Sequence, residues 1–321
     1  MTSIGFIGLG TMGGPMALNI VKGGYKVKGF DIDETLVKYH SKNNGIVAKT
    51  ASEAALDTDI LFTMLPNSDH VKSALFDENG AIESLKKGSI VIDMSTINPI
   101  ETDGIREKLK EKGIAMIDAP IGRTSVEARI GKSLLMLGGE KNDIEKATPV
   151  LNHIGDTLID CGGPGMGSRM KIVNNYMTTV LNVLSGEVLT LARAVGLEQS
   201  TCIEVLSGTP AVKSHIKTTY PVKVLNNDVS PAFMVNLALK DLGIAVNLGD
   251  DVNVPLDLGK ASVKTYKSAV DEGRGKQDWT SVFLNLQKYD DWQDEPQPWE
   301  CASNQARLNY SGSLFLRIGE Q

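Results

Sequence analysis

The sequence is poor in the residues that build disulfide frameworks and metal sites. Its 321 residues include three cysteines, which stand far apart without CxxC spacing, so neither disulfides nor a structural zinc site is indicated. The four histidines are equally isolated, and the sequence predicts no metal site and no catalytic role for any of them. These histidines are His40, His70, His153 and His215.

An excess of positive charge and long apolar runs are absent too. Lysine and arginine number 33 against 39 acidic residues, a net charge of −6, so the basic surface that nucleic-acid binding needs is not expected. No uninterrupted apolar run reaches about 18 residues, which argues against a membrane span. The N-terminus has no basic flank or signal-type core. We therefore predict a soluble, cytoplasmic protein that holds any anionic ligand with locally placed cations.

The first half of the chain contains a regular alternation of short apolar runs and amphipathic stretches, which is typical of βαβ units. The predicted strands are 4–7, 26–30, 60–64, 90–94, 115–118, 133–137 and 157–160. The predicted helices between them are 15–22, 34–41, 52–56, 70–76, 100–112 and 144–153. We therefore expect an α/β fold, with a Rossmann-type doubly wound parallel sheet over residues 1–162.

The texture changes after the glycine-rich stretch 162–165. From residue 166 to about 195 there is no proline and apolar residues recur at helical spacing, which predicts a long helix. Further helices are expected at 199–206, 212–218, 234–248 and 258–272. We expect residues 163–287 to form an all-helical substrate and oligomerisation domain that begins with the long interdomain helix. The polar segment 288–321 lacks periodicity, and disorder, a partner-binding arm and an artefact of the expressed sequence all fit it.

A glycine pattern joins the first predicted strand to its helix. Gly8, Gly10 and Gly13 form G-x-G-x-x-G directly after residues 4–7. Gly8 permits a tight turn, Gly10 lets the backbone approach a pyrophosphate, and Gly13 allows the helix to pack closely on the strand. Asp31 closes the second strand, where a carboxylate binds the adenosine ribose hydroxyls and repels a 2′-phosphate. The pattern predicts NAD (NADH) as the cofactor.

Other cofactor contacts are expected at the carboxyl ends of later strands, because ligands bind at that edge of an open parallel sheet. Together with the loop, these predicted cofactor contacts are Thr11, Met12, Leu65, Pro66 and Thr96. A glycine-rich turn that merely packs a helix is the alternative. The strand, the helix and Asp31 in their expected places make that alternative the less favoured one.

A polar cluster falls at the start of the predicted long helix. Lys171 and Asn174 share a face by i,i+3 spacing, and Asn175 follows. A lysine in such a place can bind a substrate carbonyl oxygen and pass a proton to the alkoxide as hydride arrives. A solvated helix lysine beside two asparagines is the structural alternative.

The motifs in sequence order resemble those of the β-hydroxyacid dehydrogenase family. GFIGLGTMG, the strand-end Asp31, MLPN, DMST, DAPIGRTS, GPGMGSRMKIVNN and LKDL follow one another in the family's order over residues 1 to about 287. The resemblance implies an NAD-dependent oxidoreductase in which Lys171 is the catalytic acid/base and Asn174 holds the substrate. It also implies that Lys240 lies near the nicotinamide end of the cofactor, and that the chain forms a homodimer or homotetramer.

The chain departs from the family at the substrate loop. Most relatives read D-x-P-V-S-G-G, and this chain has Gly122, Arg123 and Thr124 in place of Ser-Gly-Gly. That departure argues against an ordinary 3-hydroxyisobutyrate or tartronate semialdehyde substrate. An arginine fork beside hydroxyls suits a tetrahedral anion with three acceptor oxygens, such as a sulfonate or phosphonate. The predicted substrate contacts are Arg123, Thr124, Ser125, Asn174, Asn175 and Thr178.

Three alternatives stay open. Arg123 could be a surface residue paired with a carboxylate such as Glu127. The anion could be a carboxylate, as in succinic semialdehyde and γ-hydroxybutyrate. A non-catalytic NAD-binding regulator would keep the glycine loop, but it would have no need of Lys171 beside two asparagines.

Overall fold

The computed structural model describes residues 2–209, 211, 214–251 and 253–287. The chain divides into two compact units, Met1–Val180 and a second unit that begins at Leu181. The division falls inside the long helix α8, Met166–Ala194, rather than ahead of it. The domain boundary expected after residue 162 stays a prediction, and the expected polar tail 288–321 lies outside the described residues.

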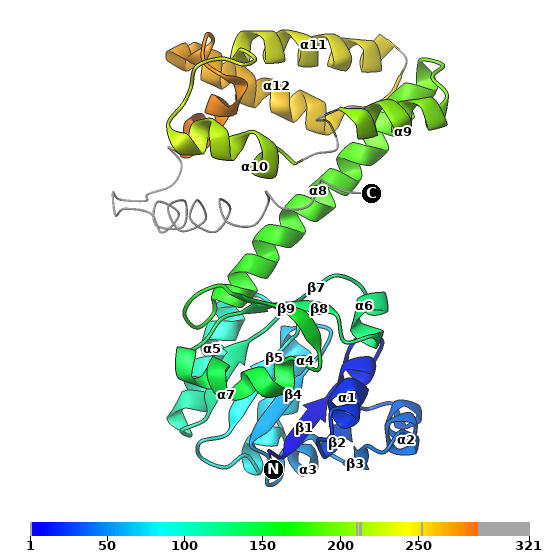
Figure 1. Cartoon of the computed structure of the whole chain (residues 1–321), viewed down its shortest axis with the longest axis vertical. Coiled ribbons are helices and arrows are strands. Elements are labelled where there is room, and N and C mark those ends of the chain that lie inside the picture. The colour runs from blue at the N-terminus through cyan, green and yellow to red at the C-terminus, as the bar shows by residue number, and fades with distance from the viewer. Residues whose placement is uncertain (1, 210, 212–213, 252, 288–321) are drawn as a thin grey trace, which may run out of the picture. The chain divides into compact units, whose positions relative to one another are not determined.

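A parallel sheet forms the centre of the first unit (Figure 1). Its six strands follow the order β3-β2-β1-β4-β5-β6, so the chain builds outward from β1 first to one edge and then to the other. This order and the parallel pairings are those of the predicted Rossmann-type doubly wound sheet. The strands are β1 Ile4–Ile7, β2 Val27–Phe30, β3 Ile46–Val47, β4 Ile60–Thr63, β5 Ile90–Asp93 and β6 Ala115–Asp118.

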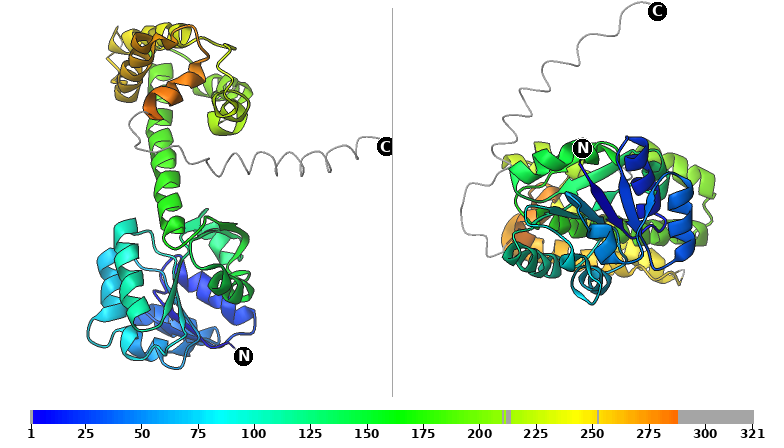
Figure 2. Two further views of the ribbon diagram at one scale, coloured as in Figure 1. Left: turned by 90° about the vertical axis from the view of Figure 1, so that its left-hand side faces the viewer. Right: turned by 90° about the horizontal axis from the view of Figure 1, so that it is seen from below.

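Helices cover both faces of this sheet, because the central strands are apolar on both. On one face Phe6 stacks on Phe62 and packs with α1, α2 and α7, and on the other Leu61 and Val91 pack with α3, α4 and α5. Figure 2 shows the sheet between the two helical layers. The helices are α1 Gly13–Lys22, α2 Glu34–Lys42, α3 Ala51–Ala55, α4 Ser68–Phe76, η1 Ala81–Glu83, α5 Pro99–Glu111 and α7 Lys141–Leu151.

The last two predicted strands do not join the large sheet, and this corrects the expectation of a single sheet. β8, Ser133–Leu137, pairs in parallel with β9, Gly155–Asp160, and antiparallel with a strand that was not predicted, β7, Ile121–Gly122. After β6 the chain turns back. Asp118 and Gly138 form an isolated antiparallel bridge, and the Pro120 carbonyl oxygen accepts the Met136 N–H of β8 at 3.1 Å. A short helix that was also not predicted, α6 Ser125–Arg129, follows β7.

The second unit is helical in its described part, as predicted. Its segments tie together around Asp278, which is buried and accepts the backbone N–H groups of Ala232 and Phe233. None of the described helices is long and apolar enough to cross a membrane. The helices after α8 are α9 Gln199–Gly208, α10 His215–Thr218, η2 Tyr220–Val222, η3 Val224–Asn226, α11 Val235–Asp251, α12 Asp257–Ala269, η4 Val270–Arg274, η5 Trp279–Ser281 and α13 Val282–Gln287.

Candidate active site

The loop between β1 and α1 has the geometry that the glycine pattern predicts. Gly8 has a φ of +93°, and a Cβ there would lie 2.2 Å from the carbonyl oxygen of Met64. A Cβ on Gly13 would lie 2.0 Å from the Gly8 carbonyl oxygen, so only glycine lets α1 start this close to the loop. The Cβ position of Gly10, by contrast, has nothing within 4 Å. The loop is therefore closed on its inner side and open to a ligand on its outer side.

Asp31 follows β2 and is held against this loop. Its Oδ2 accepts the Leu9 N–H at 2.7 Å, and its Oδ1 accepts the Asp33 N–H at 2.9 Å. A cavity of about 430 Å³ opens beside it at the carboxyl ends of β1, β2 and β4. Predicted cofactor residues that line this cavity are Gly8, Gly10, Asp31, Leu65 and Pro66. Lining residues that the sequence did not single out include Phe30, Ile32, Thr50, His70, Ser73 and Asn79.

The start of α1 completes the cofactor site. Thr11 and Met12 form the turn before the helix, and Met12 at the N-cap offers no side-chain hydrogen bond to the first amides. Those amides, the open face of Gly10 and the carboxylate of Asp31 fit the pyrophosphate and ribose of a dinucleotide. Together they support the predicted use of NAD.

The ends of β4 and β5 are tied together on the same edge of the sheet. The Leu65 N–H donates to Ser95 Oγ at 2.9 Å, and the next residue, Thr96, is exposed. Asp93 lies beneath, buried completely, and accepts Thr63 Oγ1 at 2.8 Å and the Ser95 N–H at 3.1 Å through Oδ1. Its Oδ2 has no hydrogen-bond partner in the described part of the chain. Burial raises the pKa of Asp93 to about 6.

Lys171 lies in the second turn of α8, and its side chain reaches back to β7. Its Nζ donates to the carbonyl oxygen of Ile121 at 2.5 Å. The side chain is half-buried, and this burial lowers the pKa of Lys171 from its ordinary value. Asn174 lies one turn further on, and its Nδ2 donates to Asn175 Oδ1 at 3.3 Å. The hydrogen bond and the partial burial of Lys171 disfavour the alternative of a freely solvated helix lysine.

Two other predicted site residues lie further along the chain. Thr178 belongs to α8, but its side chain lies outside the part that the structure describes. Lys240 is exposed on α11 in the second unit. Their roles at the site stay predictions.

Arg123 stands in a tight turn after β7. Its φ of +69° is left-handed, a conformation that costs a residue with a side chain roughly 1 to 2 kcal/mol. The guanidinium donates to Asp156 Oδ1 and the Lys132 carbonyl oxygen, both at 2.6 Å, and to Thr157 Oγ1 at 2.9 Å. The alternative of a surface arginine paired with a carboxylate therefore holds in this structure, with Asp156 as the partner in place of Glu127.

Thr124 and Ser125 belong to the start of α6. Thr124 Oγ1 donates to Glu127 Oε2 at 2.6 Å and accepts the Val126 N–H at 3.2 Å, and the Thr124 N–H donates to Glu127 Oε2 at 2.9 Å, which completes a capping box. Ser125 is the first residue of the helix. The Thr124 hydroxyl therefore serves the helix in this structure, and the predicted substrate contacts of both residues stay predictions.

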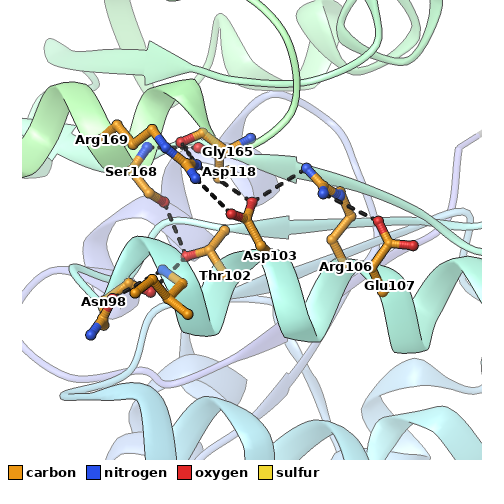
Figure 3. Close-up of polar contacts among 10 residues, drawn as sticks. Asn98, Thr102, Asp103, Arg106, Glu107, Asp118, Gly165, Ser168 and Arg169 are labelled. Carbon is orange, nitrogen blue, oxygen red and sulfur yellow. Dashed lines mark hydrogen bonds and ion pairs between the residues drawn. The ribbon is translucent and has the colours of Figure 1, made fainter. Parts of the chain in front are cut away.

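Asp118 binds the start of α8. It belongs to the motif DAPIGRTS, but the sequence predicted no role for it. Its side chain is buried, and it accepts the Gly165 N–H at 2.7 Å through Oδ1 and the Ser168 N–H at 2.6 Å through Oδ2 (Figure 3). Burial raises the pKa of Asp118, against the opposing effect of the Ser168 and Gly165 amides. A buried strand-end aspartate hints at such a role, but its partners lie far along the chain.

Helix α5 contacts the same turns of α8 from a second side (Figure 3). Asp103 Oδ2 accepts Arg169 Nη2 at 2.6 Å, and Thr102 Oγ1 donates to Ser168 Oγ at 3.3 Å. Asp103 also pairs with Arg106 on its own helix. The first turns of α8 are thus bound both by the buried strand end and by a more exposed ion pair.

Comparisons with known proteins agree with this geometry. Residues 3–163 match the family described as the NAD binding domain of 6-phosphogluconate dehydrogenase, and residues 165–286 match the NAD-binding domain of NADP-dependent 3-hydroxyisobutyrate dehydrogenase. The 3-sulfolactaldehyde reductase of Escherichia coli is 45% identical over 88% of this chain and 95% of that protein. The mitochondrial 3-hydroxyisobutyrate dehydrogenase of Drosophila melanogaster is 32% identical over 89% and 90%.

A solved structure gives the same result. The 3-hydroxyisobutyrate dehydrogenase of Mycobacterium tuberculosis with L-serine is 29% identical, with a TM-score of 0.64 over 89% of this chain and 99% of that one. These relatives are dehydrogenases and reductases, and they give no support to the alternative of a non-catalytic NAD-binding regulator.

Proposed function

We propose that this chain, which belongs to the 3-hydroxyisobutyrate dehydrogenase family, reduces 3-sulfolactaldehyde to 2,3-dihydroxypropane-1-sulfonate with NADH. It is an NAD-dependent oxidoreductase acting on CH–OH groups, as its relatives are. Two observations support the sulfonate: the 45% identity to a 3-sulfolactaldehyde reductase, and the presence of Arg123, whose guanidinium suits an anion with several acceptor oxygens. An NAD-dependent succinic semialdehyde reductase is the second candidate, since Arg123 also suits a carboxylate.

Different residues of the proposed cofactor site would bind different parts of the dinucleotide. The open backbone at Gly10 and the first amides of α1 would hold the pyrophosphate, and Asp31 would hold the adenosine ribose. Leu65 and Pro66 close the cavity at the end of β4, and Thr96 and Lys240 complete the proposed set. Bound NADH supplies a hydride to the aldehyde carbon.

The proposal rests mainly on the placement of Lys171, a half-buried lysine whose ammonium is held by the Ile121 carbonyl oxygen. Its ammonium donates a proton to the substrate oxygen, so that the alkoxide formed on hydride arrival becomes the alcohol, and the neutral amine then regains a proton from solvent. Partial burial lowers the pKa of Lys171, which makes the ammonium a better acid for reduction and the free amine more abundant for oxidation. The Ile121 carbonyl holds the ammonium in place.

Arg123 is the proposed anion contact, with Thr124, Ser125, Asn174, Asn175 and Thr178 as further substrate residues. The left-handed backbone at Arg123 supports the proposal, because strain of this kind persists where a side chain serves the site. Its guanidinium is bound to Asp156 and Thr157, so the anion has to compete with Asp156 for it.

The direct test compares NADH oxidation at matched concentrations of 3-sulfolactaldehyde and succinic semialdehyde, with NADPH in parallel. The proposal expects a kcat/KM preference for the sulfonate of roughly tenfold or more, and for NADH over NADPH. A preference for the carboxylate would leave the family and the cofactor intact and give the second candidate the substrate.

We also propose that the chain forms a homodimer or homotetramer in the cytoplasm, with residues 163–287 as the substrate and oligomerisation domain. The resemblance to the family is what supports this assembly. Light scattering on the purified protein measures its mass, and a monomer would contradict this part of the proposal.

A further inference from the structure

The segment 118–121 makes two hydrogen bonds to α8, one from each of its ends. Asp118 ends β6 and its carboxylate accepts the Ser168 N–H, whereas Ile121 begins β7 and its carbonyl oxygen accepts from Lys171 Nζ. Ser168 and Lys171 are neighbours across one turn of the helix. The segment therefore contacts α8 both at its first turn and at the side chain of the proposed acid/base.

Asp118 commits both of its oxygens to the helix. Oδ1 binds the Gly165 N–H and Oδ2 binds the Ser168 N–H, and Figure 3 shows the carboxylate beside this first turn. The first amides of a helix have no partner inside the helix, and they carry the positive end of its dipole. One buried carboxylate thus accepts hydrogen bonds from two of these amides, and its negative charge is favourable beside the positive end of the helix dipole.

The surroundings leave the helix start little room to move. A Cβ on Gly138 would lie 2.5 Å from the Gly167 backbone nitrogen and 2.7 Å from Asp118 Oδ1. A Cβ on Gly167 would lie 2.2 Å from the Met136 carbonyl oxygen. Because both positions are glycine, α8 starts directly against the strand ends, and its rotation about its own axis is fixed there.

We propose that Asp118 is a positioning residue for Lys171, an inference that rests on the proposed role of Lys171 as acid/base. Through Gly165 and Ser168, Asp118 sets the first two turns of α8 so that the ammonium of Lys171 meets the Ile121 carbonyl. A shift of about 1 Å at a reacting group can cost on the order of a hundredfold in rate. Asp118 is absent from the lining of the cofactor cavity, so its loss acts on kcat and spares NADH binding.

Asp118→Asn is the first test. Asparagine keeps the shape of the side chain, but its NH₂ group faces one of the two backbone N–H groups, a donor against a donor. We expect kcat for 3-sulfolactaldehyde to fall roughly tenfold to a hundredfold. The NADH Kd, from fluorescence titration, stays within about twofold of wild type. Asp103→Asn is the matched control, because it removes the other carboxylate that binds this part of α8, and its kcat should stay within about threefold.

A double-mutant cycle separates positioning from general loosening. If Asp118 acts through Lys171, adding Asp118→Asn to Lys171→Ala leaves the residual rate unchanged. Additive losses in the cycle overturn the proposal, and so do equal losses of kcat in Asp118→Asn and Asp103→Asn. A wild-type rate in Lys171→Ala alone overturns the proposed function instead, so the two failures are distinguishable.

Gly138→Ala is a second variant, for use if Asp118→Asn does not fold. It keeps the carboxylate, but its Cβ presses on Asp118 and on the first turn of α8. The same pattern is expected: a lower kcat, an unchanged NADH Kd and no further loss in the Lys171→Ala background. A folded Gly138→Ala protein with wild-type kcat would overturn the proposal.

Discussion

The first unit holds two parts of the proposed site: the cofactor end, which is the glycine loop with Asp31, and the helix end, which is the start of α8 with Lys171. The contacts that hold these two parts span different lengths of the chain. At the cofactor end, Asp31 binds the amide of Leu9, a neighbour 22 residues away, and Gly13 packs on the carbonyl of Gly8. At the helix end, Asp118 binds the amide of Ser168 and Lys171 binds the carbonyl of Ile121, both across 50 residues. The hydrogen bonds of the helix end therefore join parts of the chain that are further apart than the Asp31–Leu9 pair at the cofactor end. Substitutions at the first should change cofactor affinity, and substitutions at the second should change the rate.

Lys171→Ala should produce the largest effect and tests the helix end directly. We expect kcat to fall by a factor of about 10² to 10⁴, because proton transfer loses its donor, while the NADH Kd stays within about twofold. Steady-state kinetics and fluorescence titration measure the two quantities. Lys146→Ala, at an exposed lysine paired with Asp143, is the control. Weaker NADH binding at unchanged kcat would break the division between the two ends.

Arg123→Ala tests which substrate group the helix end reads. The loss of a charged hydrogen bond should lower kcat/KM for 3-sulfolactaldehyde by roughly tenfold to a hundredfold, and that for uncharged glyceraldehyde much less. Asp156→Asn frees the guanidinium and keeps Arg123, so it serves as the matched control and should not lower sulfonate turnover. Equal losses on the two aldehydes would contradict the anion contact.

Asp31→Asn tests the cofactor end. The amide cannot accept both backbone N–H groups and both ribose hydroxyls, so the NADH Kd should rise by about tenfold with kcat at saturating NADH little changed. The preference for NADH over NADPH should shrink at the same time. Asp33→Asn, at the N-cap of α2, controls for loss of a nearby carboxylate. A fall in kcat at unchanged NADH affinity would contradict the comparison.

Asp93→Asn should leave catalysis nearly unchanged and alter stability with pH. A folded-state pKa raised from 3.8 to about 6 means that the folded state binds the proton more tightly, so wild type loses stability as the pH rises through that window. The variant lacks this loss. We expect its unfolding free energy relative to wild type to increase by the order of 2 kcal/mol between pH 4 and pH 7, measured by urea titration. A difference that does not change with pH would contradict the raised pKa.

The contrast between local and distant contacts also explains what the sequence could predict. Strands 4–7, 115–118 and 133–137 have the predicted bounds, because the three or four apolar residues in each give a clear pattern. The two-residue β7 and the five-residue α6 are too short to show periodicity, so the smaller sheet was missed. The tight turn at Gly8 and the close packing at Gly13 were predictable from the glycine spacing.

At the helix end the sequence predicted the residue types but not their partners. Lys171 stands out in the sequence beside two asparagines. Nothing in the neighbouring sequence shows that its ammonium donates to the Ile121 carbonyl oxygen, or that Asp118 accepts the backbone N–H of Ser168 at the start of the same helix. The same limit applies to Arg123, whose partner proved to be Asp156 on another strand rather than the nearby Glu127. Contacts between separate elements depend on the tertiary fold, which propensity and spacing do not encode.

Helix α8 carries residues of both units, since the chain divides at Val180. Lys171 stands before that division, on the same body as the glycine loop and Asp31. The proton donor and the site proposed for the hydride carrier therefore belong to one compact unit. The second unit is therefore free to diversify in evolution while the arrangement of these groups in the first unit is inherited unchanged.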